Sequence, residues 1–475
     1  MDGIAAIVDL NREVPEPHYP HRFVPQVMVS PQRSVDNVRM DFSHSPQAQA
    51  LRQRLVAFMQ QYLLPYNAAW HKSVQDGIYP PPFVEDLKLL ARDEGLWNLF
   101  LPGLAEDEPG TRLSNLDYAP LAEAMGRLPW AAEVFNCSAP DSGNMELLHL
   151  FATHDQRLKW LFPLLRGDIR SAFAMSEPDV ASSDPTNLQT TVRRAGDELV
   201  ISGRKWFITG AAHPNCKLLI VMCRNAGEEA DGDEERGVHH NHSMVLVPMD
   251  TRGVQVVRNI TVVHHHAPEG HCEILFRDVH VAAANLLGDW GKGFAMAQAR
   301  LGPGRIHHCM RTIGQCELAL ELAAERMLER QAFGKYLSDY SNVQEWLAES
   351  RIEIDQARLL VLQAAWMLDN KNTDKNMDSS QVRAQVSAIK VVAARLQTRV
   401  VDRAMQTFGA MGLSPDTPLA YFWTWGRAMH LMDGPDEVHL RTVARHELAQ
   451  ARGRMGQSAA YFTTPEQLQA LPRIR

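Results

Sequence analysis

AMSEPDVASSD at residues 174–184 and GRKWFITGA at residues 203–211 are the stretches that decide how this chain folds. A polar, turn-forming segment and two short runs of alternating apolar and polar residues separate them, which is typical of strands. Ser176, Ser182 and Thr209 supply hydroxyl groups, and Phe207 supplies a flat aromatic face. This combination suits a planar ring that needs apolar cover on one side and hydrogen bonds along its edge. The alternative for Phe207 is packing within a strand core, which we expect for its neighbour Trp206.

Two further motifs lie far along the chain: RLGPGRIHHCMRTIG at residues 300–314 and LMDGPDEVH at residues 431–439. Together with the first two, in this order, they resemble the acyl-CoA dehydrogenase family, and best the branch that contains family members 10 and 11. The resemblance covers residues 45–452 and makes residues 174–211 a flavin pocket. It implies FAD as the cofactor and α,β-dehydrogenation of an acyl-CoA thioester to the trans-2-enoyl-CoA. The electrons would pass to an electron-transfer flavoprotein.

The spacing of apolar residues divides the chain into regions. Residues 45–168 have helical patterns, residues 169–288 have period-two strands, among them 199–202 and 205–208, and residues 289–455 are helical again. The last region has four long amphipathic segments, at 294–331, 340–369, 379–408 and 421–451, with a break predicted at Gly302-Pro303-Gly304. An extended N-terminal arm (1–44) and a C-terminal tail (456–475) flank these regions. The resemblance implies an α+β multi-domain fold with an N-terminal helical domain, a middle β-barrel-like domain that binds flavin, and a C-terminal four-helix bundle.

Asp433 is the candidate catalytic base, because the family has a carboxylate at this place that removes the α-proton of the thioester. Most members have Glu there, whereas this branch has Asp. Such a base needs a water-poor site, in which we expect its pKa to rise toward the working pH. The alternative is that Asp433 caps the helix beginning near Gly434, and a helix-end role is the one we favour for Asp436. Arg305 would orient Asp433 or the thioester; a surface arginine on a kinked helix is an equally good alternative.

The resemblance also assigns the remaining contacts. Phe173, Met175 and Ser176 would lie at one flavin edge, Ser182 at the diphosphate, and Phe207 and Thr209 at the ring. Arg330 and Phe333 of RQAFGK (330–335), with Gln406 and Gly409 of MQTFGAMGL (405–413), would contact the FAD of a neighbouring subunit. We therefore expect a homo-oligomer, either a dimer or a tetramer. The other predicted cofactor residues are Pro435 and Glu437, and the predicted substrate-binding residues are Ser182, Arg305, Asp433 and Gly434.

The composition is that of an ordinary globular protein, with 475 residues, 45% of them hydrophobic and 22% charged. The net charge of -8 argues against a nucleic-acid partner, and it requires local groups to hold anionic cofactors. No apolar run is long enough to cross a membrane, and the cysteines are scattered, which favours reduced thiols. With neither a secretory signal nor a C-terminal peroxisomal tripeptide, we expect a cytoplasmic protein.

Histidine-rich runs at 239–242 and 264–266 resemble metal-binding tracts. Adjacent histidines on an extended chain point to opposite faces, and no carboxylate or cysteine completes a regular spacing, so we expect no metal site.

Other functions on the same fold stay open, namely an acyl-CoA oxidase or a nitroalkane oxidase, and so does a flavin-free interaction protein. In some members of the branch an attached kinase domain handles phosphorylated 4-hydroxyacyl-CoA. The 44 residues before the first helical region could not form such a domain, so we expect direct oxidation of a saturated acyl-CoA. Because Asp is shorter than Glu, the site would accept a bulkier or branched chain.

Overall fold

The computed structural model describes residues 40–227, 240–371 and 378–463, without the side chains of residues 459 and 460. The chain divides into a unit of residues 1–41 and a unit of residues 42–475, and the description below concerns the second. Almost all of the predicted N-terminal arm and the greater part of the predicted tail lie outside the described residues.

The first region of the described chain is helical, as the sequence predicts. Its first helix begins after Ser45, whose side chain accepts a hydrogen bond from the backbone N–H of Ala48, and Pro46 occupies the first turn. Ser45 and Pro46 therefore form the N-cap and first-turn pair that the helix end requires. The helices of this region are α1 (Pro46–Phe58), α2 (Asn67–Gln75), α3 (Phe83–Asp93), α4 (Asn115–Gly126), α5 (Ala131–Val134), α6 (Asp141–Phe151), α7 (His154–Gln156) and α8 (Phe162–Arg166).

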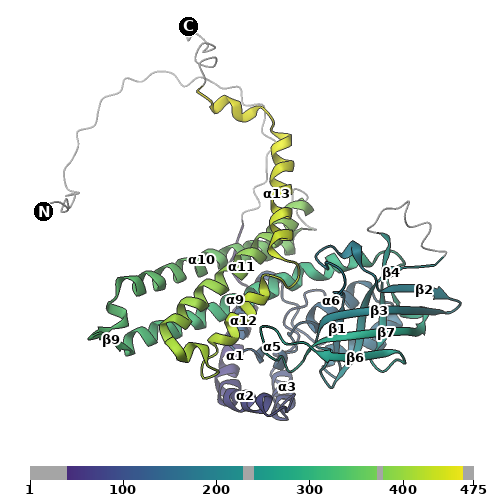
Figure 1. Cartoon of the computed structure of the whole chain (residues 1–475), viewed down its shortest axis with the longest axis horizontal. Helices are drawn as coiled ribbons and strands as arrows, with labels where there is room; N and C mark the ends of the chain where they lie inside the picture. Colours follow the sequence, from purple (N-terminus) through teal and green to yellow (C-terminus); the bar gives the residue numbers. More distant parts are fainter. Residues whose placement is uncertain (1–39, 228–239, 372–377, 464–475) are drawn as a thin grey trace, which may run out of the picture. The chain divides into compact units, whose positions relative to one another are not determined.

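The strands of the second region form one mixed sheet (Figure 1). Neighbouring strands follow the order β6-β7-β3-β2-β4-β5-β8, and β1 pairs with β4. Both β1 and β2 run parallel to β4. The bounds are β1 (Arg170–Ala174), β2 (Thr191–Ala195), β3 (Glu198–Thr209), β4 (Cys216–Asn225), β5 (His242–Pro248), β6 (Val254–Asn259), β7 (His271–Ala282) and β8 (Leu286–Leu287).

The prediction of two separate strands at 199–202 and 205–208 is wrong, because β3 runs unbroken through both. Two register shifts against β7 absorb the irregularity that the sequence pattern suggested. Gly203 is needed at the first of them, since a Cβ there would meet the Thr190 Oγ1 atom at 2.5 Å.

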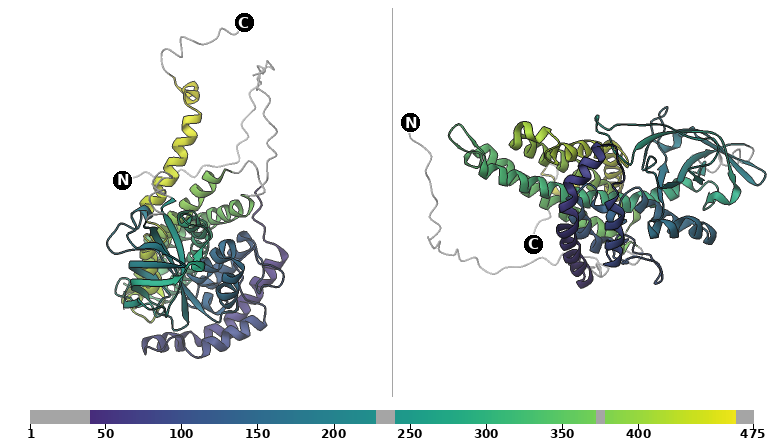
Figure 2. Two further views of the ribbon diagram at one scale, coloured as in Figure 1. Left: turned by 90° about the vertical axis from the view of Figure 1, so that its right-hand side faces the viewer. Right: turned by 90° about the horizontal axis from the view of Figure 1, so that it is seen from below.

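Three long helices of the third region pack side by side, visible as the green helices in Figure 2. They are α9 (Gly293–Glu329), α10 (Ser341–Asn370) and α11 (Ser379–Phe408), and the short strands β9 (Gln331–Ala332) and β10 (Lys335–Tyr336) join the first two. The predicted break at Gly302-Pro303-Gly304 is wrong, because α9 continues through Pro303. A helix tolerates a proline when tertiary packing offsets the lost hydrogen bond, and Pro303 is buried.

The fourth long segment, predicted at 421–451, is also wrong as a single helix. The structure has α12 (Leu419–Met429) and α13 (Asp436–Gly453), both packed against α11. Between them Asp433 and Gly434 adopt positive φ angles of 52° and 104°, which no right-handed helix can include. Pro435 then precedes the new helix as its N-cap residue.

The two faces of the sheet belong to different cores. On β4, Leu218, Ile220 and Met222 pack into the large cluster that also contains the helices. Leu219 and Val221 belong to a second cluster formed within the strand region. No helix among the described residues combines the length and apolar composition needed to cross a bilayer.

Candidate active site

A cavity of 2640 Å³ lies where the N-terminal helices, the sheet and the long helices meet. Pockets for single small ligands are typically about 300–1,000 Å³, so this volume suits a large cofactor together with a substrate. The structure brings ten of the predicted site residues to its wall: Phe173, Met175, Ser176, Ser182, Phe207, Thr209, Arg305, Asp433, Gly434 and Pro435.

Five predicted cofactor residues do not line this cavity: Arg330, Phe333, Gln406, Gly409 and Glu437. All five are exposed, and Phe333 is exposed to 101%. The strand β9 beside Phe333 lies at the far end of the long helices from the sheet (Figure 1). The structure of a single copy therefore gives Phe333 no apolar surroundings.

A buried ion pair ties together the two motifs that open the sequence. Lys205 Nζ lies 2.8 Å from Glu177 Oε1, and the side chains are 0% and 3% exposed. Glu177 also accepts hydrogen bonds from the backbone N–H groups of Gln189 and Thr190. Ser182 Oγ accepts a hydrogen bond of 2.9 Å from the backbone N–H of Glu177. These contacts fold the turn-rich segment back onto β3 and place Ser182 at the cavity wall.

Phe207 lies on the cavity wall and not in a strand core. Its side chain is 42% exposed, and its φ of 51° is unusual for an aromatic residue. Trp206, which we expected in the core, is half-buried and lines the cavity as well. Thr209 Oγ1 lies 3.0 Å from His271 Nδ1, so the orientation of this hydroxyl is fixed.

Asp433 lies in the loop between α12 and α13, two residues before the N-cap of α13. The helix has no side-chain cap, so the capping alternative for Asp433 is wrong. Its backbone carbonyl accepts hydrogen bonds from Arg305 Nε at 2.9 Å and from His439 Nε2 at 3.2 Å. Lys390 Nζ donates to the carbonyl of Gly434 at 3.1 Å. These donors hold a left-handed conformation that costs an L-residue about 1–3 kcal/mol.

The contact with Asp433 also decides between the two interpretations of Arg305. Its guanidinium is not that of a free surface arginine, because it is partly buried against the Asp433 backbone. Asp436, for its part, lies in the first turn of α13, and its Oδ2 is 2.6 Å from His430 Nδ1.

The pKa of Asp433 differs from the sequence-based expectation. Burial alone would raise it, but the contact with His308 and the positive charges of Arg305, Arg300 and Lys390 hold the pKa below the usual aspartate value. The expected rise is therefore wrong, since these interactions outweigh desolvation. Asp433 is a carboxylate at neutral pH, which is the form that can accept a proton.

Sequence reasoning missed two residues of α9 that lie beside Asp433. Arg300 is 9% exposed, its Nε donates to Asn144 Oδ1 at 3.0 Å, and its Cζ lies 4.2 Å from the centre of the Phe173 ring. His308 Nε2 lies 3.5 Å from Asp433 Oδ2. Both belong to the motif at 300–314, but their spacing gives no signal, since Arg300 and Arg305 are five residues apart and lie on different sides of α9.

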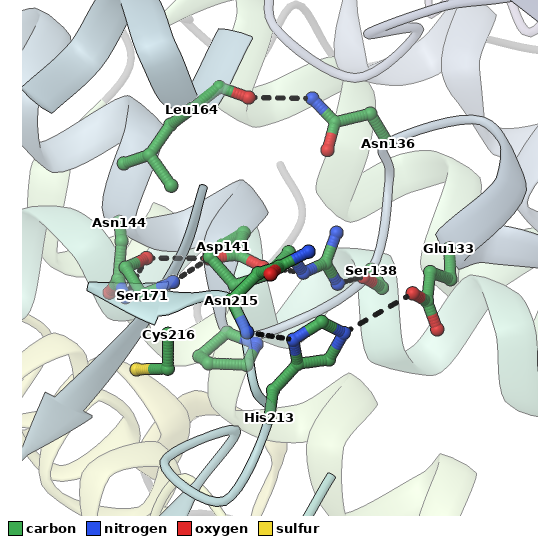
Figure 3. A network of polar contacts seen from close by, with 12 residues as sticks. Glu133, Asn136, Ser138, Asp141, Asn144, Leu164, Ser171, His213, Asn215 and Cys216 are labelled. Carbon is green, nitrogen blue, oxygen red and sulfur yellow. Dashed lines mark hydrogen bonds and ion pairs between the residues drawn. The ribbon is translucent and has the colours of Figure 1, made fainter. Parts of the chain in front are cut away.

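A buried polar network forms another part of the cavity wall (Figure 3). Asp141 accepts hydrogen bonds from the backbone N–H and the hydroxyl of Ser171, both at 2.6 Å, and pairs with Arg170 Nε at 2.8 Å. Nearby, His213 lies between the backbone N–H of Asn215 and Glu133. Burial would raise the pKa of Glu133, but Lys88, His213 and Arg170 hold it well below the usual value. This network fixes α6 against β1.

The comparisons with known proteins agree with this geometry. Family models of the acyl-CoA dehydrogenase N-terminal, middle and C-terminal domains match residues 45–168, 172–279 and 291–448. Probable acyl-CoA dehydrogenase FadE2 of Mycobacterium tuberculosis is 50% identical over 87% of this chain and 98% of its own length. The chain belongs to the acyl-CoA dehydrogenase family. It is therefore a flavoprotein oxidoreductase of the class that dehydrogenates acyl-CoA thioesters.

Two further relatives extend the comparison. Acyl-CoA dehydrogenase family member 11 of Gallus gallus is 44% identical over 86% of this chain, which spans only 51% of that relative. Butyryl-CoA dehydrogenase of Megasphaera elsdenii, a solved structure, is 25% identical with a TM-score of 0.71, over 86% of this chain and 100% of that one. The acyl-CoA dehydrogenase fold of this chain thus extends over both its helical regions and its sheet.

Among the described residues of this acyl-CoA dehydrogenase, no three His, Cys, Asp or Glu side chains are grouped as a metal site requires. His239, in one of the two histidine runs, lies outside the described residues. All six cysteines are buried and free.

Proposed function

We propose that this acyl-CoA dehydrogenase uses FAD to convert a saturated acyl-CoA into the trans-2-enoyl-CoA, with Asp433 as the base. The observation that carries the proposal is the place of Asp433: its carboxylate lies at the cavity wall beside His308, and Arg305 donates to its backbone carbonyl. A carboxylate at the wall of a cavity can remove a proton from a carbon atom of a molecule bound there. The proton leaves the substrate α-carbon and stays on Asp433.

The cavity wall fits a flavin. Phe207 offers a half-exposed aromatic face, and the hydroxyls of Ser176 and Thr209 lie on the same wall. Phe173, Met175, Ser182 and Pro435 would complete the contacts from this copy. FAD supplies the acceptor for the hydride that leaves the β-carbon. The residues of the chain position the base and exclude water around it, which strengthens electrostatic contacts in the cavity.

The exposed residues Arg330, Phe333, Gln406 and Gly409 support a homo-oligomer. Phe333, exposed to 101% on a turn, offers its whole apolar surface to a second molecule, and burying that surface would stabilise the contact. Arginine can bind two oxygens of a diphosphate at once, which suits Arg330 to the FAD of a second copy. We infer a dimer or tetramer with FAD near the interface, and Glu437 as a further contact.

The remaining parts of the proposal rest on the family resemblance and on the sequence. The electrons pass to an electron-transfer flavoprotein, the location is cytoplasmic, and Gly434 and Ser182 contact the substrate together with Arg305. The shorter side chain of Asp433 leaves space for a bulky or branched acyl chain.

The test is the Asp433→Asn variant loaded with FAD and mixed with acyl-CoA under anaerobic conditions. We expect wild-type flavin content and acyl-CoA affinity, with loss of the yellow absorbance slowed by about 10²–10⁴-fold, the usual contribution of a general base. Bleaching at the wild-type rate would refute the assignment. Rapid reoxidation of the reduced wild type by O₂ would instead identify an oxidase.

A further inference from the structure

His308 and Arg311 form a chain of contacts that leads from α9 to the carboxylate of Asp433. Arg311 Nη2 lies 3.2 Å from His308 Nδ1, and His308 Nε2 lies 3.5 Å from Asp433 Oδ2. A guanidinium only donates hydrogen bonds, so His308 Nδ1 must accept. The proton of the neutral imidazole is therefore on Nε2, the nitrogen that faces Asp433.

The surroundings keep this imidazole neutral. Burial and the positive charge of Arg311 lower the pKa of His308 to about 4, although Asp433 acts in the opposite direction. Arg300 and Lys390 also disfavour a positive His308, and Arg305 and His439 contact the backbone carbonyl of Asp433 rather than its carboxylate. A neutral N–H donor can orient a carboxylate without giving up its proton at working pH.

The neighbouring His307 has no comparable position. Its ring packs edge-on against Tyr118 and Phe100, with centroids 4.9 Å and 6.0 Å away, inside the helical core. Adjacent residues on a helix point in directions about 100° apart, so only one of the two histidines can face the cavity. His308 lines the cavity.

We propose that His308 is a positioning residue, whose Nε2–H orients Asp433 Oδ2 toward the substrate α-carbon. The inference rests on the proposed role of Asp433 as the base. His308 takes up no proton in the reaction: the substrate proton goes to Asp433, while Nε2 keeps its own proton and Nδ1 keeps its contact with Arg311. Catalytic contacts are often long before the substrate binds, and the distance of 3.5 Å shortens when the carboxylate turns toward the thioester.

Two variants of similar size test the Nε2–H donor of His308 directly, because the side-chain amide nitrogens of Gln and Asn lie at different distances from the backbone. In His308→Gln the amide nitrogen reaches the place of Nε2, whereas in His308→Asn it reaches only the place of Nδ1. With FAD-loaded protein we expect His308→Asn to bleach the flavin about tenfold more slowly, as befits one hydrogen bond to a charged group, and His308→Gln to stay within about threefold of wild type. Acyl-CoA affinity and flavin content stay unchanged in both.

The pH profile gives a second measurement that a purely structural role would not move. Loss of the Nε2 donor destabilises the charged carboxylate of Asp433 and so raises its pKa. The acid limb of the pH profile of the bleaching rate therefore moves to higher pH in His308→Asn but not in His308→Gln. The control is His430→Leu, which has no polar side-chain atom and therefore removes a histidine–aspartate contact of 2.6 Å made by Nδ1 in the same loop, away from the cavity wall. We expect its rate and acid limb to match the wild type.

Three results would overturn the inference. The first is a wild-type rate and acid limb in His308→Asn, and the second is no recovery in His308→Gln. The third is a further tenfold loss when His308→Asn is added to Asp433→Asn, because a residue that acts through Asp433 has no effect once that carboxylate is gone. If Asp433→Asn alone bleaches at the wild-type rate, the proposed base fails and His308 fails with it; an inactive Asp433→Asn with a fully active His308→Asn refutes His308 alone.

Discussion

Glu177 and Lys205 form a buried ion pair of 2.8 Å that joins the two motifs of the flavin pocket. The pocket can depend on this ion pair even if neither side chain contacts FAD. Lys205 also donates to the carbonyl of Met175 at 2.9 Å, which adds a second contact between the two motifs. The pair holds the segment with Ser176 and Ser182 against the strand that carries Phe207 and Thr209.

We predict that Lys205→Met lowers the unfolding free energy by about 3–5 kcal/mol, because it leaves a buried carboxylate without its partner. Flavin content should fall in parallel. Thermal unfolding and the 450 nm absorbance of the purified protein measure the two effects. An unchanged Tm with full flavin would contradict the prediction.

The same pair predicts a loss of stability in acid. Burial would raise the pKa of Glu177, but Lys205 and the backbone donors hold it below its usual value of 4.5. The folded state therefore binds fewer protons than the unfolded state, so the stabilisation is fully present above pH 4.5 and is lost as the pH falls through the lower folded pKa. The difference in Tm between the wild type and the Lys205→Met/Glu177→Gln double variant should shrink below pH 4.5. A constant difference across this range would exclude Glu177 as its source.

We predict that Asp433→Glu keeps only partial activity, lower by about 10–100-fold, because a displacement of about 1 Å at the base can cost 10²-fold. Asp also tolerates the left-handed conformation at φ 52° better than Glu does. Bleaching rates with acyl-CoAs of different bulk measure the effect. The longer side chain should penalise branched substrates more than straight ones, and equal losses for both would contradict the explanation.

For the assembly, we predict that Phe333→Ser and Arg330→Gln reduce flavin retention without lowering the Tm of the apoprotein. Both side chains are exposed in a single copy, so their removal costs the isolated fold little. Analytical ultracentrifugation and flavin content after dialysis are the measurements. The comparison is Leu328→Ser, because Leu328 is another exposed apolar residue and lies near the end of α9. A monomeric wild type with full flavin would refute the role of the interface.

The substrate range follows from the position of the base. We predict that kcat/KM for a 2-methyl-branched acyl-CoA stays within about tenfold of that for the straight chain of equal length, because the space left by the shorter Asp433 removes most of the penalty of about 1–3 kcal/mol that a tight pocket imposes on one extra methyl group. The 4-hydroxylated acyl-CoA belongs in the same panel. Activity restricted to short straight chains would show that the shorter Asp433 leaves no extra space.

Much of the architecture could be predicted because local patterns and packing agree. The bounds of α11 match the apolar periodicity of residues 379–408, and the strands from β1 to β8 fall within residues 169–288, where the sequence alternates with a period of two. The errors fall where tertiary contacts override local preference. Pro303 stays inside α9, and the loop at Asp433 interrupts an amphipathic pattern that continues on both sides.

The chemistry of the site was less predictable for a similar reason. Burial raises the pKa of any carboxyl group, but the pKa of Asp433 also depends on cations contributed by α11 and α9, more than 40 residues and about 130 residues away in the chain, respectively. His308 has no local signal that separates it from His307, because only the packing of α9 decides which ring faces the cavity.

The cations around Asp433 also affect how ligand affinities of this protein should be measured. Arg300, Arg305 and Lys390 all attract the Asp433 carboxylate, so the local potential at this carboxylate is positive within a chain whose net charge is -8. Small anions in the buffer will collect there by attraction and compete with anionic ligands, most strongly at low ionic strength, where screening is weakest. Titrations in chloride, acetate and phosphate at matched ionic strength will therefore give different apparent affinities for the same acyl-CoA.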